Sequence, residues 1–508
     1  MAKKKHKHNK GAPSRQENPA VTPAQPQGIF SQYAVVAAFV IVVASFFTHL
    51  YGADFTHRKR ITTVDESVYS RLGLQLKEGL EYSTVSMFNE NLRAGRQLPA
   101  YFKDPLFKHP PFYSFLISLS YTFLEKKPNY SFEELYALSS KVSNLMGCLL
   151  IFTVFLLGRT IYDYRVGLLA AFILAIEVNL LNCSQKVWME STLAAMFWLA
   201  VYFFYKGKDQ PWYFILWGIS GGLALLTKYP AVLVFISTLT YAALVERKVF
   251  KSFLFYIGLF IAGILFLPWI LTNIEHYGRE LFIGNTFRGW VFSRFDKFFY
   301  LILGFGAAFF ILFILKKKSQ VVYEKISRFK STAGFLLSVA LSFSIVYLII
   351  QPDFRESLFK SLTWHGYPKT GWAMGSFNEE PWYFYIKHIL EYSPFYIFFF
   401  IGMVKAPLGS KGDGLLLSVA FWTLAFTSFY GNYQGRYILY FTPAAVLLSV
   451  RVIIDIFNFL LKKEIGAQRA APLRLVAASL FAVALLYFAA KTAQVSWFHA
   501  MTDNVAYY

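Results

Sequence analysis

Long apolar stretches separated by short polar connections form the main pattern of this chain. Runs of about 17–25 apolar residues recur, each long enough to cross a hydrocarbon core of roughly 30 Å as a helix. The pattern predicts an all-α integral membrane protein with about 13 transmembrane helices. The predicted spans are 29–50, 138–158, 166–183, 190–206, 212–227, 230–246, 252–274, 298–315, 331–350, 382–404, 413–430, 437–460 and 473–490.

Two segments between the first and second spans show a different pattern. Residues 64–80 have Val68, Leu72, Leu76 and Leu80 at every fourth position, with charged residues between them. This spacing predicts an amphipathic helix lying on the membrane surface. The apolar segment 110–124 has only about 15 residues, which is short for a span. We expect a second juxtamembrane helix there, inside one continuous outer loop.

Basic residues occupy every second connection, and cytoplasmic loops are the ones enriched in Lys and Arg. The basic connections include Arg159 and Arg165, Lys206 and Lys208, Arg247, Lys248 and Lys251, residues 316–318, Lys405 and Lys411, and Lys462, Lys463 and Arg469. This alternation of basic connections places the basic tail 1–28, which we expect to be disordered, in the cytoplasm. The transmembrane domain is predicted at 29–490. It places the loops 51–137 and 352–381 and the tail 491–508 outside, in a multi-pass plasma (bacterial inner) membrane.

Composition supports a membrane protein and argues against nucleic-acid binding. Hydrophobic residues make up 56% of the chain and charged residues 16%, which is too little polar surface for a soluble globule of this size. The net charge of +21 is spread over the connections, so membrane lipids and lipid phosphates are the expected partners, with no nucleic acid. Cys148 and Cys183 both fall in or at the end of predicted spans, so no disulfide framework is expected.

Two acidic positions on the predicted outer face are candidates for catalysis. Asp65 and Glu66 begin the first amphipathic helix, where they can cap its N-terminus or provide a general base for an acceptor hydroxyl. Glu190 follows a short outer turn; it can be solvated, pair with Lys186, or orient a substrate.

Basic and aromatic residues at the same face are candidates for binding. Lys228, at a tight outer turn, either snorkels or neutralises a phosphate, and Arg436 suits bidentate phosphate binding. His109 precedes Pro110 and Pro111, which give a rigid entry to the second surface helix; it can meet a phosphate or an acceptor. The aromatic residues of loop 352–381 either anchor at the interface or stack on sugar rings. Arg451 and Asp455, four residues apart, predict an internal ion pair.

These residues resemble the C-type-fold (GT-C) glycosyltransferases that use polyprenyl-phosphate donors, including protein O-mannosyltransferases and lipid A aminoarabinose transferases. The matching segments run in family order after one N-terminal span. They are Asp65-Glu66-Ser67-Val68-Tyr69, His109-Pro110-Pro111, Leu157-Gly158-Arg159, Glu190, Thr227-Lys228-Tyr229-Pro230, Pro268-Trp269, Pro381-Trp382-Tyr383-Phe384-Tyr385 and Arg436-Tyr437. Glu190 stands where the family commonly has Asp, and 298–351 matches no part of the pattern.

The resemblance implies a glycosyltransferase that moves a hexosyl or pentosyl group from a polyprenyl-phosphate donor to a lipid, glycan or protein acceptor, with inversion. Asp65 and Glu190 would be catalytic. Glu66, Tyr69, His109, Lys228, Tyr229, Arg436 and Tyr437 would contact substrate. No metal site and no cofactor are expected. The alternative is a flippase or transporter of a lipid-linked substrate, which predicts functional polar groups near the bilayer midplane and broken helices.

Overall fold

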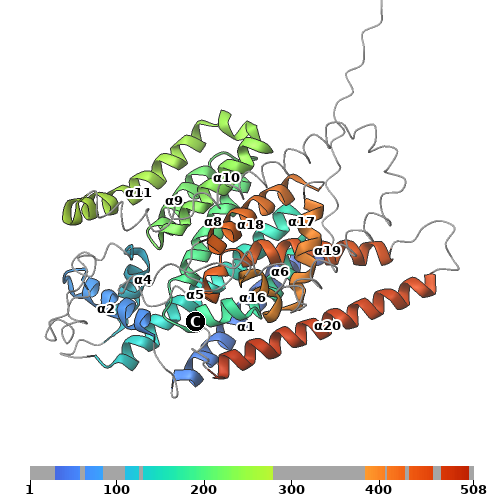
Figure 1. Cartoon of the computed structure of the whole chain (residues 1–508), viewed down its shortest axis with the longest axis horizontal. Helices are drawn as coiled ribbons and strands as arrows, with labels where there is room; N and C mark the ends of the chain where they lie inside the picture. Colours follow the sequence, from blue (N-terminus) through green and yellow to red (C-terminus); the bar gives the residue numbers. More distant parts are fainter. Residues whose placement is uncertain are drawn as a thin grey trace, which may run out of the picture.

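The structure is a computed structural model, and it describes residues 29–57, 63–83, 109–124, 130–278, 384–406, 409–429, 434–461 and 471–502. All regular elements in these ranges are α-helices or 3₁₀-helices, so the predicted all-α class is confirmed for this part of the chain (Figure 1). The predicted tail 1–28, the spans 298–315 and 331–350 and the loop 352–381 lie outside the described residues.

Each of the eleven other predicted spans coincides with a helix or with two consecutive helices. In chain order the α-helices are α1 (Ile29–His57), α2 (Val64–Glu78), α4 (Phe112–Ser120), α5 (Phe132–Ile161), α6 (Tyr164–Ala175), α7 (Val178–Gln185), α8 (Glu190–Gly207), α9 (Tyr213–Leu225), α10 (Val232–Leu244), α11 (Phe253–Tyr277), α16 (Phe384–Tyr392), α17 (Ile397–Lys405), α18 (Lys411–Phe429), α19 (Thr442–Leu461) and α20 (Ala471–Thr502). Short 3₁₀-helices include η4 (Tyr229–Ala231), η8 (Pro394–Tyr396) and η10 (Gly435–Ile438).

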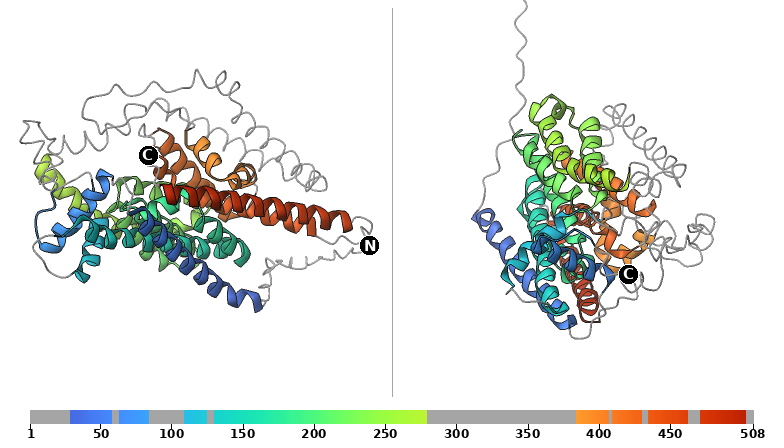
Figure 2. Two further views of the ribbon diagram at one scale, coloured as in Figure 1. Left: turned by 90° about the horizontal axis from the view of Figure 1, so that it is seen from below. Right: turned by 90° about the vertical axis from the view of Figure 1, so that its left-hand side faces the viewer.

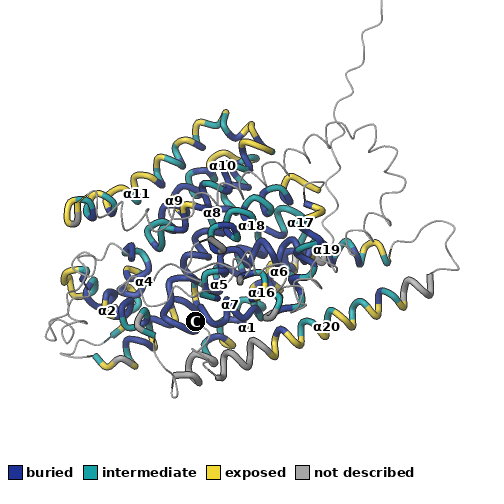
Figure 3. Tube along the Cα trace, viewed as in Figure 1, coloured by how far each residue is buried: buried dark blue, intermediate teal, exposed yellow. Residues whose placement is uncertain are grey.

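Five helices in the described part are long and apolar enough to cross a membrane, or six spans if α6 and α7 count as one. The predicted number of thirteen is therefore not reached among the described residues. The helices α1, α11 and α20 carry exposed apolar side chains along their outer faces, and Figure 3 shows these exposed stripes on α11 and α20. Phe39, Phe260, Ile264 and Leu486 are examples. In a membrane these faces would contact lipid, where exposed apolar surface has no hydration cost.

The predicted span 166–183 is not one straight helix, because α6 and α7 meet at an angle of 58°. Glu177 lies at the break and accepts a hydrogen bond from the backbone N–H of Leu180 across 2.8 Å. This contact satisfies an amide at the start of a new helix and so favours the break. The predicted span 382–404 is also interrupted, at Ser393 and Pro394, since a proline ring cannot continue a helix. The first break directs α7 toward the turn that precedes α8.

Tight packing of the central helices depends on small residues. A Cβ atom added to Gly218 on α9 would lie 2.0 Å from the carbonyl oxygen of Gly258 on α11, so only glycine permits this backbone approach. Close approach at small residues is the usual way in which helices associate in membranes. The indole of Trp217 is completely buried beside this contact.

The helices α2 and α4 pack against each other at one end of the bundle (Figures 1 and 2). They form a small separate core with Leu72, Tyr113 and Tyr121. The nine residues of α4 give a length of about 14 Å, less than half of a hydrocarbon core. The helical segment from Phe112 to Phe123 is shorter than the helices that are long enough to cross a membrane. That α2 and α4 lie on the outer membrane surface remains a prediction.

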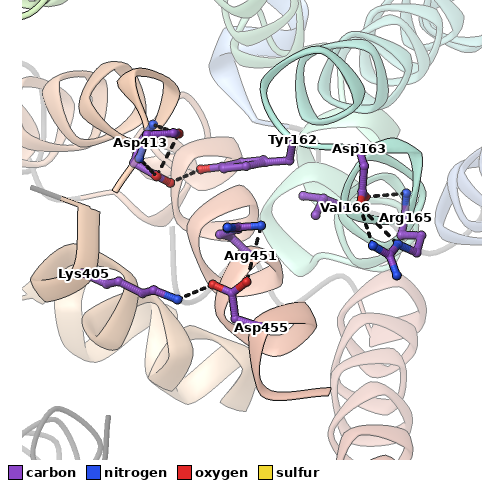
Figure 4. Close-up of polar contacts among 9 residues, drawn as sticks. Tyr162, Asp163, Arg165, Val166, Lys405, Asp413, Arg451 and Asp455 are labelled. Atoms are coloured by element: carbon purple, nitrogen blue, oxygen red, sulfur yellow. Dashed lines mark hydrogen bonds and ion pairs between the residues drawn. The ribbon is translucent and has the colours of Figure 1, made fainter. Parts of the chain in front are cut away.

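A polar network lies at the C-terminal end of α5, which is the end far from α2 (Figure 4). Tyr162 donates a hydrogen bond to Asp413, and Asp455 pairs with both Lys405 and Arg451. The Arg451–Asp455 ion pair predicted from the sequence is confirmed, with an N–O distance of 3.4 Å. Tyr162 and Lys405 belong to connections that the charge pattern places in the cytoplasm, whereas Arg451 and Asp455 lie within the predicted span 437–460. Since α5 has 30 residues, this network lies about 45 Å along its axis from the end near α2.

Candidate functional site

Four charged side chains meet at the α2 end of the bundle. We call Asp65, Glu190, Lys228 and Arg436 the charged cluster. The Nη2 atom of Arg436 lies 2.6 Å from Oδ2 of Asp65, and its Nε lies 3.7 Å from Oε1 of Glu190. The Nζ atom of Lys228 lies 2.8 Å from the same Glu190 oxygen. The structure thus brings together the four predicted outer-face charges from four separate segments.

Each member of the charged cluster lies at or beside a helix end. Asp65 is in the first turn of α2, and Glu190 is the first residue of α8. Lys228 precedes η4 in the turn after α9, and Arg436 is in η10 before α19. The backbone N–H and C=O groups at helix ends have no partner within the helix and can interact with side-chain charges, so charges are best accommodated there. The bundle can therefore hold four charges together at one end while its middle stays apolar.

Exposure differs across the charged cluster and indicates where a substrate can approach. The side chain of Asp65 is 31% exposed and that of Lys228 is 22% exposed, whereas those of Arg436 and Glu190 are 10% and 3% exposed. Among the described residues, Oε2 of the buried Glu190 has no hydrogen-bond partner. A buried carboxylate oxygen is expected to have a donor, so this atom is suited to a hydroxyl that arrives with a ligand.

The local electrostatics keep both cations of the cluster charged. Burial is the largest single effect and lowers the pKa of Lys228, but the charge of Glu190, the hydrogen bond to Glu190 and the nearby Tyr437 together raise it by more, so the net pKa is above its usual value. Burial also lowers the pKa of Arg436, and the carboxylates of Glu190 and Asp65 reverse that effect. Two anions and two cations make the cluster neutral as a whole. A phosphate that enters must therefore share the cations with the two carboxylates.

Aromatic rings line the cationic side of the cluster. The ammonium group of Lys228 lies 4.3 Å from the ring centroid of Tyr437, and the guanidinium of Arg436 lies 5.5 Å from the same centroid. The guanidinium also lies 4.5 Å from the ring of Trp188. Such rings attract cations through their electron-rich faces without competing for their N–H donors. The donors of both cations therefore remain directed at oxygen atoms.

Tyr69 and His109 form a buried pair beside the acids. The Tyr69 hydroxyl lies 3.3 Å from Nδ1 of His109, and both side chains are less than a tenth exposed. Burial, together with the charges of Asp65 and Glu190, raises the pKa of Tyr69 well above its usual value, so its hydroxyl stays neutral. The start of α4 is tied to the same region, because the N–H of Phe112 donates to the carbonyl of Leu226, two residues before Lys228.

Two predicted binding residues have different surroundings. Tyr229 accepts a hydrogen bond from Nε1 of Trp269 across 3.1 Å and packs in an aromatic cluster with Tyr82 and Phe266. This hydrogen bond directs its hydroxyl toward α11. Glu66 is completely buried and accepts hydrogen bonds from the N–H of Val187 at 3.0 Å and of Thr63 at 2.9 Å. The capping interpretation of Glu66 is confirmed by the contact with Thr63.

Sequence reasoning did not identify three residues of the site. Trp188 contacts Arg436, Thr63 accepts a hydrogen bond from Nε1 of Trp188, and Gln434 accepts one from Nε of Arg436 across 2.7 Å. Trp188 and Gln434 each precede a predicted residue by two positions. Their closeness in the sequence to a candidate charge was the only indication of a role. The sequence alone did not show that their side chains contact Arg436.

Comparisons with known proteins identify a family and solved structures that this chain resembles. Residues 108–271, about a third of the chain, match the Dolichyl-phosphate-mannose-protein mannosyltransferase family. The matched segment contains His109, Glu190 and Lys228, whereas Asp65 and Arg436 lie outside it. A comparison with curated protein sequences found no match.

Solved structures show the same fold. The archaeal oligosaccharyltransferase AglB from Archaeoglobus fulgidus, in complex with an inhibitory peptide and a dolichol-phosphate, aligns with 94% of this chain at 15% identity and a TM-score of 0.58. This chain spans 56% of the length of AglB. ArnT from Cupriavidus metallidurans, bound to undecaprenyl phosphate, aligns with 92% of this chain and 76% of its own at 12% identity and a TM-score of 0.50. The resemblance to the C-type-fold glycosyltransferases is therefore confirmed at the level of the fold.

Proposed function

We propose that this chain is a membrane glycosyltransferase that transfers a sugar from a polyprenyl-phosphate donor to an acceptor hydroxyl at the non-cytoplasmic face. The observation that carries the proposal is the charged cluster, which places two cations and two carboxylates together in one partly buried site. The family match at residues 108–271 and the fold shared with AglB and ArnT support the class of reaction.

In the proposed reaction Asp65 removes the proton of the acceptor hydroxyl. The acceptor oxygen bonds to the anomeric carbon of the sugar, and the bond between that carbon and the phosphate oxygen breaks. The polyprenyl phosphate leaves with an additional negative charge, which Lys228 and Arg436 stabilise. The proton stays on Asp65 until solvent removes it. Attack from the side opposite the phosphate inverts the anomeric centre.

The positions of the two acids support different roles. Asp65 is the more exposed, so an acceptor can reach it. Glu190 is buried between the two cations and retains one oxygen without a partner among the described residues. We assign Glu190 to orienting Lys228 and accepting a hydrogen bond from the donor. The longer side chain of Glu, compared with the Asp common in the family, suits this reach.

A flippase without covalent chemistry is the competing function. The broken helix pair α6 and α7 and the buried Glu177 are the features that favour it. The Glu177 carboxylate, however, accepts hydrogen bonds from Leu180 and Asn179, which gives it a structural role at the break. The charged cluster, by comparison, lies at helix ends.

The test uses purified protein in lipid nanodiscs with a polyprenyl-phosphate donor that carries a labelled sugar. Release of free polyprenyl phosphate with transfer of the label identifies a transferase, whereas a flippase leaves the glycosidic bond intact. Asp65→Asn is expected to reduce turnover by about 10²-fold or more, the usual effect of losing a general base. Turnover of Asp65→Asn equal to that of the wild type would contradict the role given to Asp65.

A further inference from the structure

The indole of Trp188 lies directly against the group proposed to hold the phosphate. Its ring centroid is 4.5 Å from Cζ of Arg436, and the side chain is 1% exposed. A guanidinium that rests on an aromatic face keeps its N–H donors in its own plane. Here two of those donors reach Asp65 and Gln434. The orientation of the Trp188 ring therefore determines the plane in which Arg436 can bind oxygen atoms.

A set of hydrogen bonds fixes that ring. Nε1 of Trp188 donates to Oγ1 of Thr63 across 3.1 Å, and the same hydroxyl donates to Oε2 of Glu66 across 3.1 Å. The other oxygen of Glu66 accepts from the N–H of Val187, the residue before Trp188. We call Thr63, Glu66 and Trp188 the brace. It joins the start of α2 to the turn before α8, segments that are 121 residues apart.

We propose that the brace positions Arg436. Thr63 and Glu66 hold the indole of Trp188, and the indole holds the guanidinium where it can contact both Asp65 and the donor phosphate. This inference rests on the proposed function and deepens it. It gives Glu66 a positioning role in place of contact with the substrate, because its carboxylate already accepts three hydrogen bonds from protein groups.

Specific variants separate the parts of the brace. Trp188→Phe keeps an aromatic ring but removes the N–H donor, and Trp188→Leu removes the ring as well. Glu66→Gln places an amino group against a backbone N–H in either orientation of the amide, because Val187 and Thr63 each present one. Thr63→Val removes the shared hydroxyl with little change in shape.

The chain offers a matched control in the cap of α5. Glu134 accepts a hydrogen bond from the N–H of Ser131 across 2.9 Å, and the Ser131 hydroxyl accepts one from the N–H of Glu134. This arrangement repeats the Thr63–Glu66 contact at a helix end that has no contact with Arg436. Glu134→Gln therefore weakens an equivalent cap outside the brace.

The measurement is the affinity of the full-length protein in nanodiscs for undecaprenyl phosphate, which tests binding without catalysis. Trp188→Leu should weaken binding by about tenfold, the size expected for losing a desolvated cation–π contact. Glu66→Gln and Trp188→Phe should weaken it by roughly 3-fold, in line with the loss of one hydrogen bond. Glu134→Gln should bind as the wild type does. Thermal unfolding of each variant identifies those that fail to fold.

A double-mutant cycle distinguishes positioning from general structural damage. Arg436→Ala removes the group that the brace positions, so adding Trp188→Phe to it should cause no further loss of affinity. Equal losses in the wild-type and Arg436→Ala backgrounds would overturn the inference, and so would wild-type affinity in folded Trp188→Leu. If the wild-type protein itself does not bind undecaprenyl phosphate, the proposed function fails first. Binding that depends on Arg436 but not on Trp188 would leave the function standing and refute only the brace.

Discussion

Arg436 donates a hydrogen bond to Asp65 across 2.6 Å, although the two residues are 371 positions apart in the sequence. The contact joins the proposed base to the proposed phosphate ligand. The guanidinium competes with an acceptor hydroxyl for the oxygens of the Asp65 carboxylate, because a charge-assisted hydrogen bond already occupies one of them. A donor phosphate that binds Arg436 would weaken the hydrogen bond between Arg436 and Asp65. Binding of the donor and activation of the base are therefore linked through one side chain.

Replacing Arg436 should change both steps. We expect Arg436→Gln to raise the KM for the donor by about tenfold or more, because a charge-assisted contact to phosphate is lost. Arg436→Lys should recover only part of that loss, since an ammonium group cannot reach Asp65, Gln434 and a phosphate as a planar fork does. Steady-state kinetics with varied donor concentration provide the measurement. An unchanged KM in both variants would show that Arg436 does not contact the phosphate.

Glu190 and Lys228 should behave as a coupled pair. Glu190→Gln removes a buried charge that compensates the buried Arg436 and the partly buried Lys228, and we expect the free energy of unfolding to fall by about 1–3 kcal/mol. Lys228→Met should be destabilising for the same reason. The double variant should regain much of the stability, because replacing both members of a buried ion pair leaves no unpaired charge. Thermal unfolding in nanodiscs checks this prediction. The double variant should remain inactive, which separates its effect on stability from its effect on the reaction.

The polar network of Figure 4 should affect stability but not donor binding. Arg451 and Lys405 are 37% and 49% exposed, so their ion pairs with Asp455 are partly solvated. We expect Asp455→Asn to lower the free energy of unfolding by no more than about 1 kcal/mol. The KM for the donor should equal that of the wild type. A shift of several-fold in KM would mean that the two ends of the bundle are coupled.

Hydropathy predicted the helices, and the charge pattern correctly grouped Asp65, Glu190, Lys228 and Arg436 at one end of the bundle. Every predicted span within the described residues contains helix, because a long apolar run has few alternatives in a membrane. The breaks at Glu177 and Pro394 were missed. Glu177 can either end an apolar run or cap a new helix inside it, and the choice depends on neighbouring helices that hydropathy does not describe.

Which charged side chains form ion pairs within the site was harder to predict from the sequence. The sequence suggested Lys186 as a partner for Glu190, yet Glu190 pairs with Lys228, which is 38 residues away. The ammonium of Lys186 lies instead 5.2 Å from the ring of Trp188. Charges that are close in the sequence are the obvious candidates for an ion pair, but helix packing decides which charges come into contact. The same limit explains why Trp188 and Gln434 were overlooked.

The orientation of the bundle gives the last prediction, because the two ends of α5 should lie on opposite sides of the membrane. Glu133, in the first turn of α5, and Gln210, in the turn between α8 and α9, are both exposed. The charge pattern places Glu133 outside and Gln210 inside, since Lys206 and Lys208 precede Gln210. After Cys148 and Cys183, which are buried, are replaced by Ala, a cysteine is introduced at one position or the other. An impermeant thiol reagent on intact cells should label Glu133→Cys, and it should label Gln210→Cys only after permeabilisation. The reverse pattern would put the charged cluster on the cytoplasmic face, where the proposed transfer would have to use a donor from the opposite leaflet.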